Sequence, residues 1–165
     1  MSSRNRALYV VAVLLACACV AGGVLSFLER DERAQVRSEQ ERYGAVLASA
    51  RTEARALVNI DYRDPQAAID AITSGATGEF KEQLEQGSDP LTEILEQGEA
   101  TRAGDVVWAG VVAADGDSAR VIVATEGTVT FASRDDEPRA ENFRMQLDLD
   151  RVGGDWLTSK LEFIK

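Results

Sequence analysis

The feature that most constrains this chain is its first apolar stretch, residues 7–28, in which no side chain carries a charge. A helix of that length rises about 33 Å, which is enough to cross a hydrocarbon core of about 30 Å. We therefore expect a single transmembrane helix at 7–28. This helix separates a short N-terminal stub, residues 1–6, from residues 29–165, which are polar enough to form a water-exposed part.

The charges on either side of this stretch indicate its orientation. Arg4 and Arg6 precede it without any acidic residue, whereas a mixed cluster of acidic and basic residues follows at 29–33. Short positively charged flanks stay on the cytoplasmic side of a membrane. The chain is thus predicted to be a single-pass protein of the cell membrane, with a cytoplasmic N-terminus and an extracytoplasmic C-terminal domain.

Two alternatives concern the same stretch: a cleaved signal peptide, and a lipoprotein signal in which Cys17 is lipidated after cleavage. A signal peptide has a shorter apolar run, but here the run continues through Phe27 and Leu28. The lipoprotein signal fits poorly at Leu15 and would leave a mostly apolar segment beyond the cysteine. The length of the run therefore favours an uncleaved anchor.

Composition excludes several classes of function. The net charge of −10 disfavours nucleic acid and anionic lipid headgroups as partners of a broad surface. The chain has no histidine, which removes Ser-His-Asp catalysis, Cys-His catalysis and histidine-ligated zinc. The two cysteines, Cys17 and Cys19, lie in the apolar stretch, so the C-terminal domain has no disulfide and depends on burial for its stability.

Residues 29–58 predict a helical stalk, because they contain no proline and their first half is almost wholly charged or polar. An apolar stripe with helical spacing then begins, made by Tyr43, Val46, Leu47, Ala50, Ala54, Leu57 and Val58. We expect one helix that is solvated near the membrane and packs on the following domain further out.

Short helices are predicted next. Asp64 and Asp89 each precede a proline, a pattern typical of a helix N-cap, and the two helices should end near Gly75 and Gly98. Between them, Thr77 is expected to cap a third short helix that carries Phe80 and Leu84 on one face.

Strands follow the helices. We expect them at 105–114, at 118–131 with a bulge or bend at Gly127, at 143–150, and at 157–163 with Leu157, Ser159, Leu161 and Phe163 on one side. Turns are predicted at Asp115-Gly116 and Gly153-Gly154. Helices first and strands second indicate an α+β domain at 59–165, in which short helices pack on a curved four-stranded antiparallel sheet.

Three segments carry a resemblance to a known family: Asn59-Ile60-Asp61-Tyr62-Arg63-Asp64, residues 73–80 (TSGATGEF) and residues 156–161 (WLTSKL). With the single anchor and charged helix, they resemble the Mce-associated (mammalian cell entry) membrane proteins of actinobacteria. The resemblance implies a nuclear-transport-factor-2-like cone outside the membrane. It also implies association with subunits of Mce complexes, which import lipids and sterols. A type IV secretion component has the same cone and is the family most easily confused with this one.

Acidic residues are the candidates for a catalytic or a metal site in this chain. An isomerase of this fold needs a carboxylate base in a deep apolar pocket, for which Asp61, Tyr62, Asp64 and Asp70 are candidates by residue type. We expect these acids to be helix caps or solvated instead. The acidic loops at 115–117 and 135–137 lack the spacing of a calcium site. No catalytic residue, cofactor or metal is therefore predicted.

The motif Thr77, Gly78 and Phe80 can be interpreted in two ways. It is either a corner of the domain that binds a partner protein, or the start of a helix in which Thr77 is the N-cap and Phe80 packs in the core. The second explains the residue types more simply. Trp108 and Trp156 could anchor an interface, but a lone tryptophan in a strand more often packs in the core or on the sheet.

These features predict a non-catalytic accessory or scaffold subunit, with its role in an Mce-type lipid or sterol import complex resting on the resemblance alone. Two alternatives stay open. One is a module that binds a lipid or sterol in the open cone, in an apolar cavity lined by Val121, Phe131 and Leu147. The other is an assembly component of a type IV secretion-like channel.

Overall fold

The computed structural model of the chain describes residues 36–132 and 137–164. The predicted stub at 1–6, the predicted anchor at 7–28 and most of the acidic loop at 135–137 lie outside these residues. Among the helices that are described, none has both the length and the apolar character needed to span a membrane.

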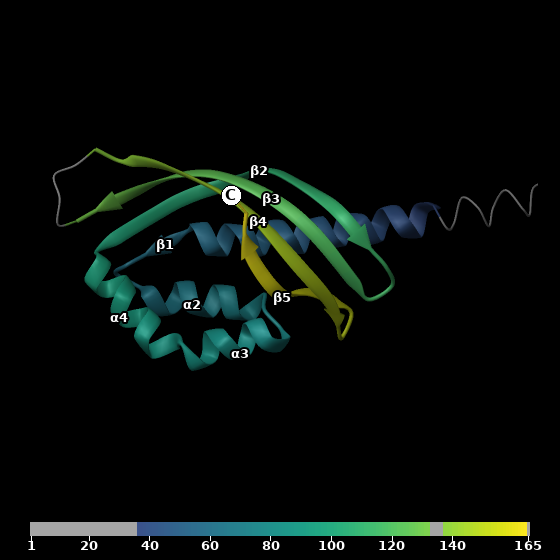
Figure 1. Ribbon diagram of the computed structural model, residues 1–165, viewed down its shortest axis with the longest axis horizontal. Coiled ribbons are helices and arrows are strands. Elements are labelled where there is room, and N and C mark those ends of the chain that lie inside the picture. The colour runs from purple at the N-terminus through teal and green to yellow at the C-terminus, as the bar shows by residue number, and fades with distance from the viewer. Residues whose placement is uncertain (1–35, 133–136, 165) are drawn as a thin grey trace, which may run out of the picture. The chain divides into compact units, whose positions relative to one another are not determined.

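The chain divides into two compact units, residues 1–42 and 43–165. In the first unit the described residues, 36–42, are helical and mostly exposed, and Val36 is among the exposed ones. In the second unit residues 43–58 are helical, and we call them the N-terminal helix. All the labelled helices and strands follow it within this second unit (Figure 1).

Three short helices follow the N-terminal helix: α2 (Pro65–Ser74), α3 (Gly78–Gln86) and α4 (Ser88–Gly98). The cap predicted at Asp64 is confirmed, because a carboxylate oxygen of Asp64 accepts a hydrogen bond of 3.2 Å from the backbone N–H of Ala67. The end predicted near Gly75 is also confirmed.

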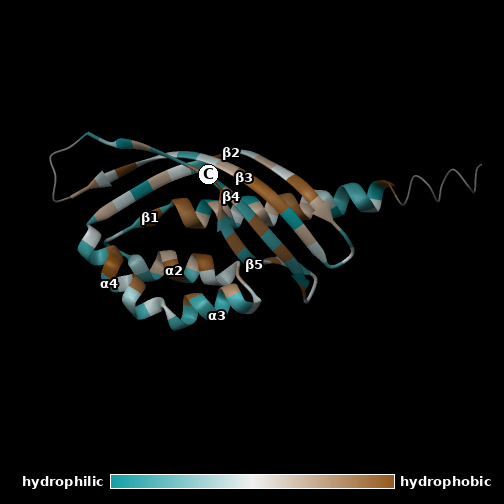
Figure 2. Ribbon diagram, viewed as in Figure 1, coloured by the Kyte–Doolittle hydropathy of each residue, from teal (hydrophilic) through white to brown (hydrophobic). Residues whose placement is uncertain are grey.

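Two predicted caps are wrong. The side chain of Thr77 makes no capping hydrogen bond at the start of α3. Helix α4 begins at Ser88, after Gly87, so Asp89 lies inside its first turn. There the carboxylate of Asp89 is placed favourably toward the positive end of the helix dipole. Figure 2 shows that α3 is largely hydrophilic, and none of its residues is fully buried.

The sheet has five strands: β1 (Ile60–Asp61), β2 (Ala100–Ala114), β3 (Ser118–Phe131), β4 (Arg139–Val152) and β5 (Asp155–Phe163). They follow each other in chain order, and each neighbouring pair is antiparallel. The sequence predicted four strands. The additional strand, β1, is two residues long and pairs with Thr101 and Arg102, so it is too short to show an alternating pattern.

Both predicted turns are confirmed. At the β2–β3 turn, one carboxylate oxygen of Asp115 accepts hydrogen bonds from the backbone N–H groups of Asp117 (3.1 Å) and Ser118 (2.8 Å). At the β4–β5 turn, Gly153 and Gly154 have φ of 64° and 105°, values that a side chain would disfavour.

Strand β2 contains two irregularities in its pairing with β3, between Val106 and Trp108 and between Val111 and Ala113. An extra residue reverses the face to which the following side chains point. As a result four β2 side chains contact the core, namely Val106, Ala109, Val111 and Ala114. Val107, Trp108 and Val112 are each more than half exposed.

The first alternative predicted at Gly127, a bulge, is wrong, because Gly127 pairs regularly with Gly104 on β2 and Glu141 on β4. The glycine is instead explained by a close approach between strands. A Cβ atom on Gly127 would lie 2.6 Å from the carbonyl oxygen of Ala103. The two facing glycines therefore let the backbones of β2 and β3 approach closely at this point.

The face predicted for the last strand is also wrong. The register of β5 against β4 shifts where Lys160 pairs with Asp148 and Thr158 pairs with Leu149, which leaves Ser159 as the extra residue. Trp156 and Thr158 are buried on one side of this bulge, and Leu161 packs on the core beyond it. Phe163 is 61% exposed and contacts the ring of Phe143, with 5.6 Å between the ring centroids.

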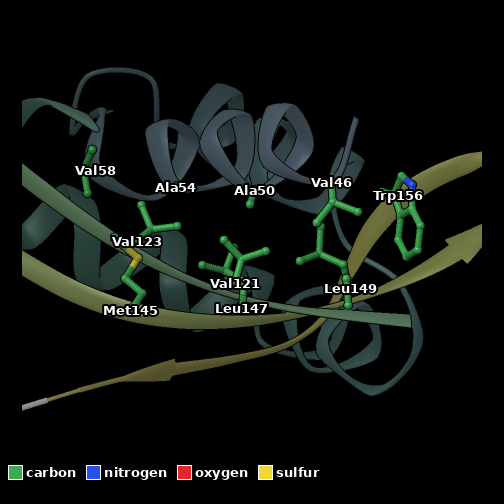
Figure 3. Packing of buried hydrophobic residues seen from close by; sticks show 11 residues of the cluster. Val46, Ala50, Ala54, Val58, Val121, Val123, Met145, Leu147, Leu149 and Trp156 are labelled. Carbon is green, nitrogen blue, oxygen red and sulfur yellow. The ribbon is translucent and has the colours of Figure 1, made fainter. Parts of the chain in front are cut away.

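The core lies between the N-terminal helix and the sheet (Figure 3). The helix contributes part of its predicted apolar stripe, and the sheet contributes alternate residues of β3 and β4 together with Trp156 of β5. The principal members are Val46, Ala50, Ala54, Val58, Val121, Val123, Met145, Leu147, Leu149 and Trp156. Alanine at two contact positions allows the helix to lie close to the strands.

A larger side chain at one of these alanines should therefore destabilise the domain. We expect Ala50→Leu to lower the free energy of unfolding by about 1–3 kcal/mol, because Ala50 is fully buried against the sheet. Ala45→Leu is the matched control, since Ala45 is exposed on the same helix. Denaturant unfolding of the full chain in detergent, followed by circular dichroism, measures both. Equal effects of the two changes would contradict the packing.

Candidate functional site

The predicted motif Thr77, Gly78 and Phe80 lies at the corner between α2 and α3, and this corner is bound to β5. The backbone N–H of Thr77 donates to the carbonyl oxygen of Thr158 at 2.8 Å. The N–H of Thr158 donates to the carbonyl oxygen of Gly75, also at 2.8 Å. Together these bonds form a short parallel bridge between Ala76 and Thr158. The corner thus covers part of the outer edge of the sheet.

Gly78 has a special backbone conformation at this corner. Its φ of 55° falls in the left-handed region, which glycine adopts without steric cost. A Cβ atom there would have Ser159 Cβ as its nearest neighbour, at 4.0 Å, so space is available. The glycine is therefore required by the turn of the chain rather than by a close contact.

Phe80 lies outside the main core cluster and is only half-buried. It lines a small pocket of about 150 Å³ between α3 and β5, together with Glu79, Gln83, Ser159, Lys160 and Leu161. The prediction that Phe80 packs in the core is thus wrong. Phe80 lies at the surface, between helix α3 and the edge strand β5.

A larger pocket of about 410 Å³ lies on the other side of the corner, where the N-terminal helix, the end of α2 and the start of β5 meet. We call it the Glu53 pocket. Its lining residues are Ala48, Ser49, Thr52, Glu53, Ser74, Gly75, Asp155, Trp156 and Leu157. Glu53 itself is only 3% exposed.

The side chain of Glu53 lies against the backbone of Gly75. A Cβ atom on Gly75 would collide with Glu53 Oε2, so only glycine leaves room for the carboxyl group. Glu53 Oε1 is shielded from solvent and has no hydrogen-bond partner among the described residues. Burial raises the pKa of Glu53 to about 7, because removal from water disfavours the charged form.

The acids that the sequence offered as catalytic candidates do not converge. Asp61 pairs with Arg63, whose Nη2 lies 2.6 Å from its carboxylate, and these hydrogen bonds lower the pKa of Asp61 to about 2. Asp64 caps α2, and Asp70 accepts a hydrogen bond of 2.7 Å from Gln66 on the surface of that helix. Tyr62 is half-buried beside them.

Glu53 was not among the site residues predicted from the sequence, although its position in the sequence carries a signal. Glu53 follows Val46 by seven residues and Ala50 by three, so it falls on the apolar stripe of its helix. A carboxylate at a stripe position predicts an acid that faces the core or another element. Acidic residues outside the stripe gave no such signal and are mostly exposed.

The two tryptophans occupy different environments. Trp156 is 5% exposed and belongs to the core, as expected for a strand residue. Trp108 is 55% exposed, and its ring lies over Gly110, where a Cβ atom would approach within 2.6 Å of the indole. Across the described ranges, no three side chains of Asp, Glu or Cys gather in a way that could hold a metal ion.

The conformation of Gly78 predicts opposite effects for two glycine substitutions. Gly78→Ala should lower the free energy of unfolding by about 1 kcal/mol, because alanine is strained at this φ. Gly44→Ala should raise it by up to about 1 kcal/mol, since Gly44 is exposed within a helix and has nothing nearby. Thermal unfolding of both variants provides the test, and a stabilising Gly78→Ala would contradict the assigned role.

Glu53 predicts a pH dependence of stability. Its ordinary pKa of 4.5 applies to the unfolded chain, whereas the folded protein keeps the proton up to about pH 7. The free energy of unfolding should therefore fall between about pH 4.5 and 7, by about 3 kcal/mol from this group. Glu53→Gln should remove this fall. The control Glu82→Gln, at an exposed position of α3, should retain it. Identical pH profiles for wild type and Glu53→Gln would overturn the assignment.

Solved structures with a similar fold include several secretion-system domains. An IcmL-like type IV secretion system protein from Legionella pneumophila has a TM-score of 0.57 at 10% identity, over 72% of this chain and 88% of that one. CagV, a VirB8 homologue from Helicobacter pylori, has a TM-score of 0.58 at 8% identity, over 74% of this chain and 98% of that one.

A ketosteroid isomerase-like protein from Erwinia carotovora atroseptica has a TM-score of 0.53 at 20% identity, over 76% of this chain and 98% of that one. At such identities the likeness is one of fold. The fold is therefore α+β with a curled antiparallel sheet, as in nuclear-transport-factor-2-like proteins.

A relative by sequence is "Uncharacterized protein Rv1363c" of Mycobacterium tuberculosis, which is 28% identical over 131 residues. The match covers 79% of this chain and 49% of the relative, so the chain spans about half the length of that protein. The family described as "Uncharacterized protein Rv1363c/MT1408-like" matches residues 6–165. Because this match includes nearly all of the sequence, the chain belongs to the Rv1363c/MT1408-like family.

Proposed function

We propose that this protein is a non-catalytic accessory or scaffold subunit of a membrane complex, and that the complex is a lipid or sterol importer of the Mce type. The observation that carries the scaffold role is the occupation of the concave face of the sheet. The N-terminal helix packs there and contributes Val46, Ala50, Ala54 and Val58 to the core (Figure 3).

This packing argues against the alternative of a lipid-binding cone. That alternative requires an apolar cavity lined by Val121, Phe131 and Leu147. Val121 and Leu147 are fully buried in the core that the helix shares, and Phe131 lies at the far end of β3. A lipid could reach these residues only if the helix moved away, which would expose the apolar surface that stabilises the domain.

We propose that the protein has no catalytic activity, because the acidic side chains that could act as a base are arranged for other roles. Asp61 forms an ion pair with Arg63, and Asp64 caps α2, so each carboxylate already has a structural role. An isomerase base needs instead a deep apolar pocket together with an oxyanion donor. The likeness to a ketosteroid isomerase-like protein is one of fold and brings no active-site residue to this chain.

The proposals of a membrane anchor and of an importer as the partner complex are both based on the sequence. An anchor at 7–28 would confine the domain to the membrane plane, which raises the effective concentration of any partner in the same membrane. The identity of the complex rests on the resemblance of residues 59–64, 73–80 and 156–161 to Mce-associated proteins.

A type IV secretion-like assembly component is the second candidate. Its support is the similar fold of the IcmL-like protein and of CagV, both named as secretion proteins or their homologues. Both proposals share the same physical role, in which a folded domain without chemistry of its own presents surfaces for assembly. They differ in the partners.

Purification of the tagged, full-length protein in mild detergent, followed by mass spectrometry of proteins and lipids, distinguishes the proposals. We expect importer subunits without stoichiometric lipid, because the concave face is occupied by the helix. Recovery of secretion-channel components without importer subunits would overturn the proposal that the partner is an importer. Stoichiometric lipid that is lost in a Val121→Asp variant, but kept in a Val112→Asp variant at an exposed site, would support the binding module.

A further inference from the structure

The Glu53 pocket has the composition of a binding site, and the proposed scaffold role does not use it. We propose that this pocket binds an alkylammonium group, the charged end of an aliphatic primary amine, with the carboxylate of Glu53 as its counter-ion. The site is independent of the proposed scaffold role and would stand if the partners of the protein were different.

The first argument is the carboxyl group itself. Buried polar groups in native proteins almost always have partners, and a buried acid without one requires an explanation. Glu53 is 3% exposed, and its Oε1 has no hydrogen-bond partner within residues 36–132 and 137–164. The same side chain lines an open pocket of about 410 Å³, so a cation in this pocket can balance the charge of the carboxylate through Oε2, while Oε1 stays enclosed by the protein.

The second argument is the electrostatic field of the pocket. Helix α2 ends there at Gly75 without a basic residue in its last turn, and the C-terminus of a helix carries partial negative charge. Asp155 adds a second carboxylate from the start of β5. No lysine or arginine is among the residues that line the pocket. The walls therefore favour a cation.

The third argument selects the kind of cation. A metal ion is disfavoured, because no group of three or more ligating side chains is found in the described part of the chain. A guanidinium group prefers both oxygens of a carboxylate, but Glu53 Oε1 is closed off by the protein. An ammonium group is a compact point charge, which a single carboxylate oxygen, here Oε2, can bind.

The remaining walls match the rest of such a ligand. The hydroxyl groups of Ser49, Thr52 and Ser74 line the pocket and can accept hydrogen bonds from the other ammonium protons. Trp156 and Leu157 supply apolar surface for a short alkyl chain.

Proton and amine compete for the same carboxylate, which gives the site a pH signature. Burial raises the pKa of Glu53 to about 7, so Glu53 is mostly neutral at pH 6 and mostly charged at pH 8. Asp155 is the other titratable side chain that lines the pocket. Affinity for the amine should therefore increase about tenfold from pH 6 to pH 8.

The test is an NMR titration of the isotope-labelled, full-length protein in detergent with n-butylammonium chloride at pH 8. Sodium chloride and tetramethylammonium chloride at equal ionic strength are the salt controls, since neither donates an N–H hydrogen bond. We expect saturable amide shifts confined to Ser49, Glu53, Gly75, Asp155 and Trp156. Nα-acetyl-lysine methylamide in a parallel titration shows whether a lysine side chain of a partner is accepted as well as a free amine.

Glu53→Gln should weaken n-butylammonium binding at least tenfold and abolish its pH dependence, whereas Glu82→Gln should leave both unchanged. Asp155→Asn, which keeps Glu53, should weaken binding by less and retain the pH dependence, and it serves as the test if Glu53→Gln does not fold. Shifts no larger than those caused by sodium chloride would overturn the proposal. So would equal binding to wild type and Glu53→Gln, or affinity that does not change with pH.

Discussion

The structure depends on one packing interaction, the contact of the N-terminal helix with the concave face of the sheet. The apolar face of this helix covers alternate residues of β3 and β4 and shields them from water. The helix contributes Val46, Ala50, Ala54 and Val58, and the strands contribute Val121, Val123, Met145 and Leu147 among others. Burial of apolar surface is the main stabilising term in a domain without disulfides. Residues 43–58 are therefore part of the compact unit, although the sequence suggested a domain that starts at residue 59.

The position of this helix also creates the candidate site. Its apolar stripe meets the sheet, and Glu53, a neighbouring stripe position, meets the end of α2 and the start of β5. The corner that follows α2 is tied to Thr158 by two backbone hydrogen bonds, and Gly75 lacks the side chain that would exclude the carboxyl group of Glu53. One helix thus both covers the concave face of the sheet and brings an acid to a surface pocket.

Much of the local structure was predictable, because its causes lie within a few residues. Asp64 and Pro65 start α2, Asp115 forms the β2–β3 turn, and Gly153-Gly154 reverse the chain between β4 and β5. The bulges in β2 and β5 were not predictable. Their extra residues depend on how a strand pairs with its neighbour, and the valine-rich sequence of β2 shows no alternation that would reveal them.

The sequence by itself determined the order of the helices and of the four longer strands, the cap at Asp64, the turns at Asp115-Gly116 and Gly153-Gly154, and the exclusion of histidine chemistry. Only the tertiary structure decided that Trp156 and Thr158, rather than Leu157 and Ser159, face the core, and that Glu53 is buried against Gly75. The physical reason is the distance along the chain between the residues that interact. Caps and turns arise from interactions between neighbours in the chain, whereas register, burial and a raised pKa arise from residues that meet only after folding.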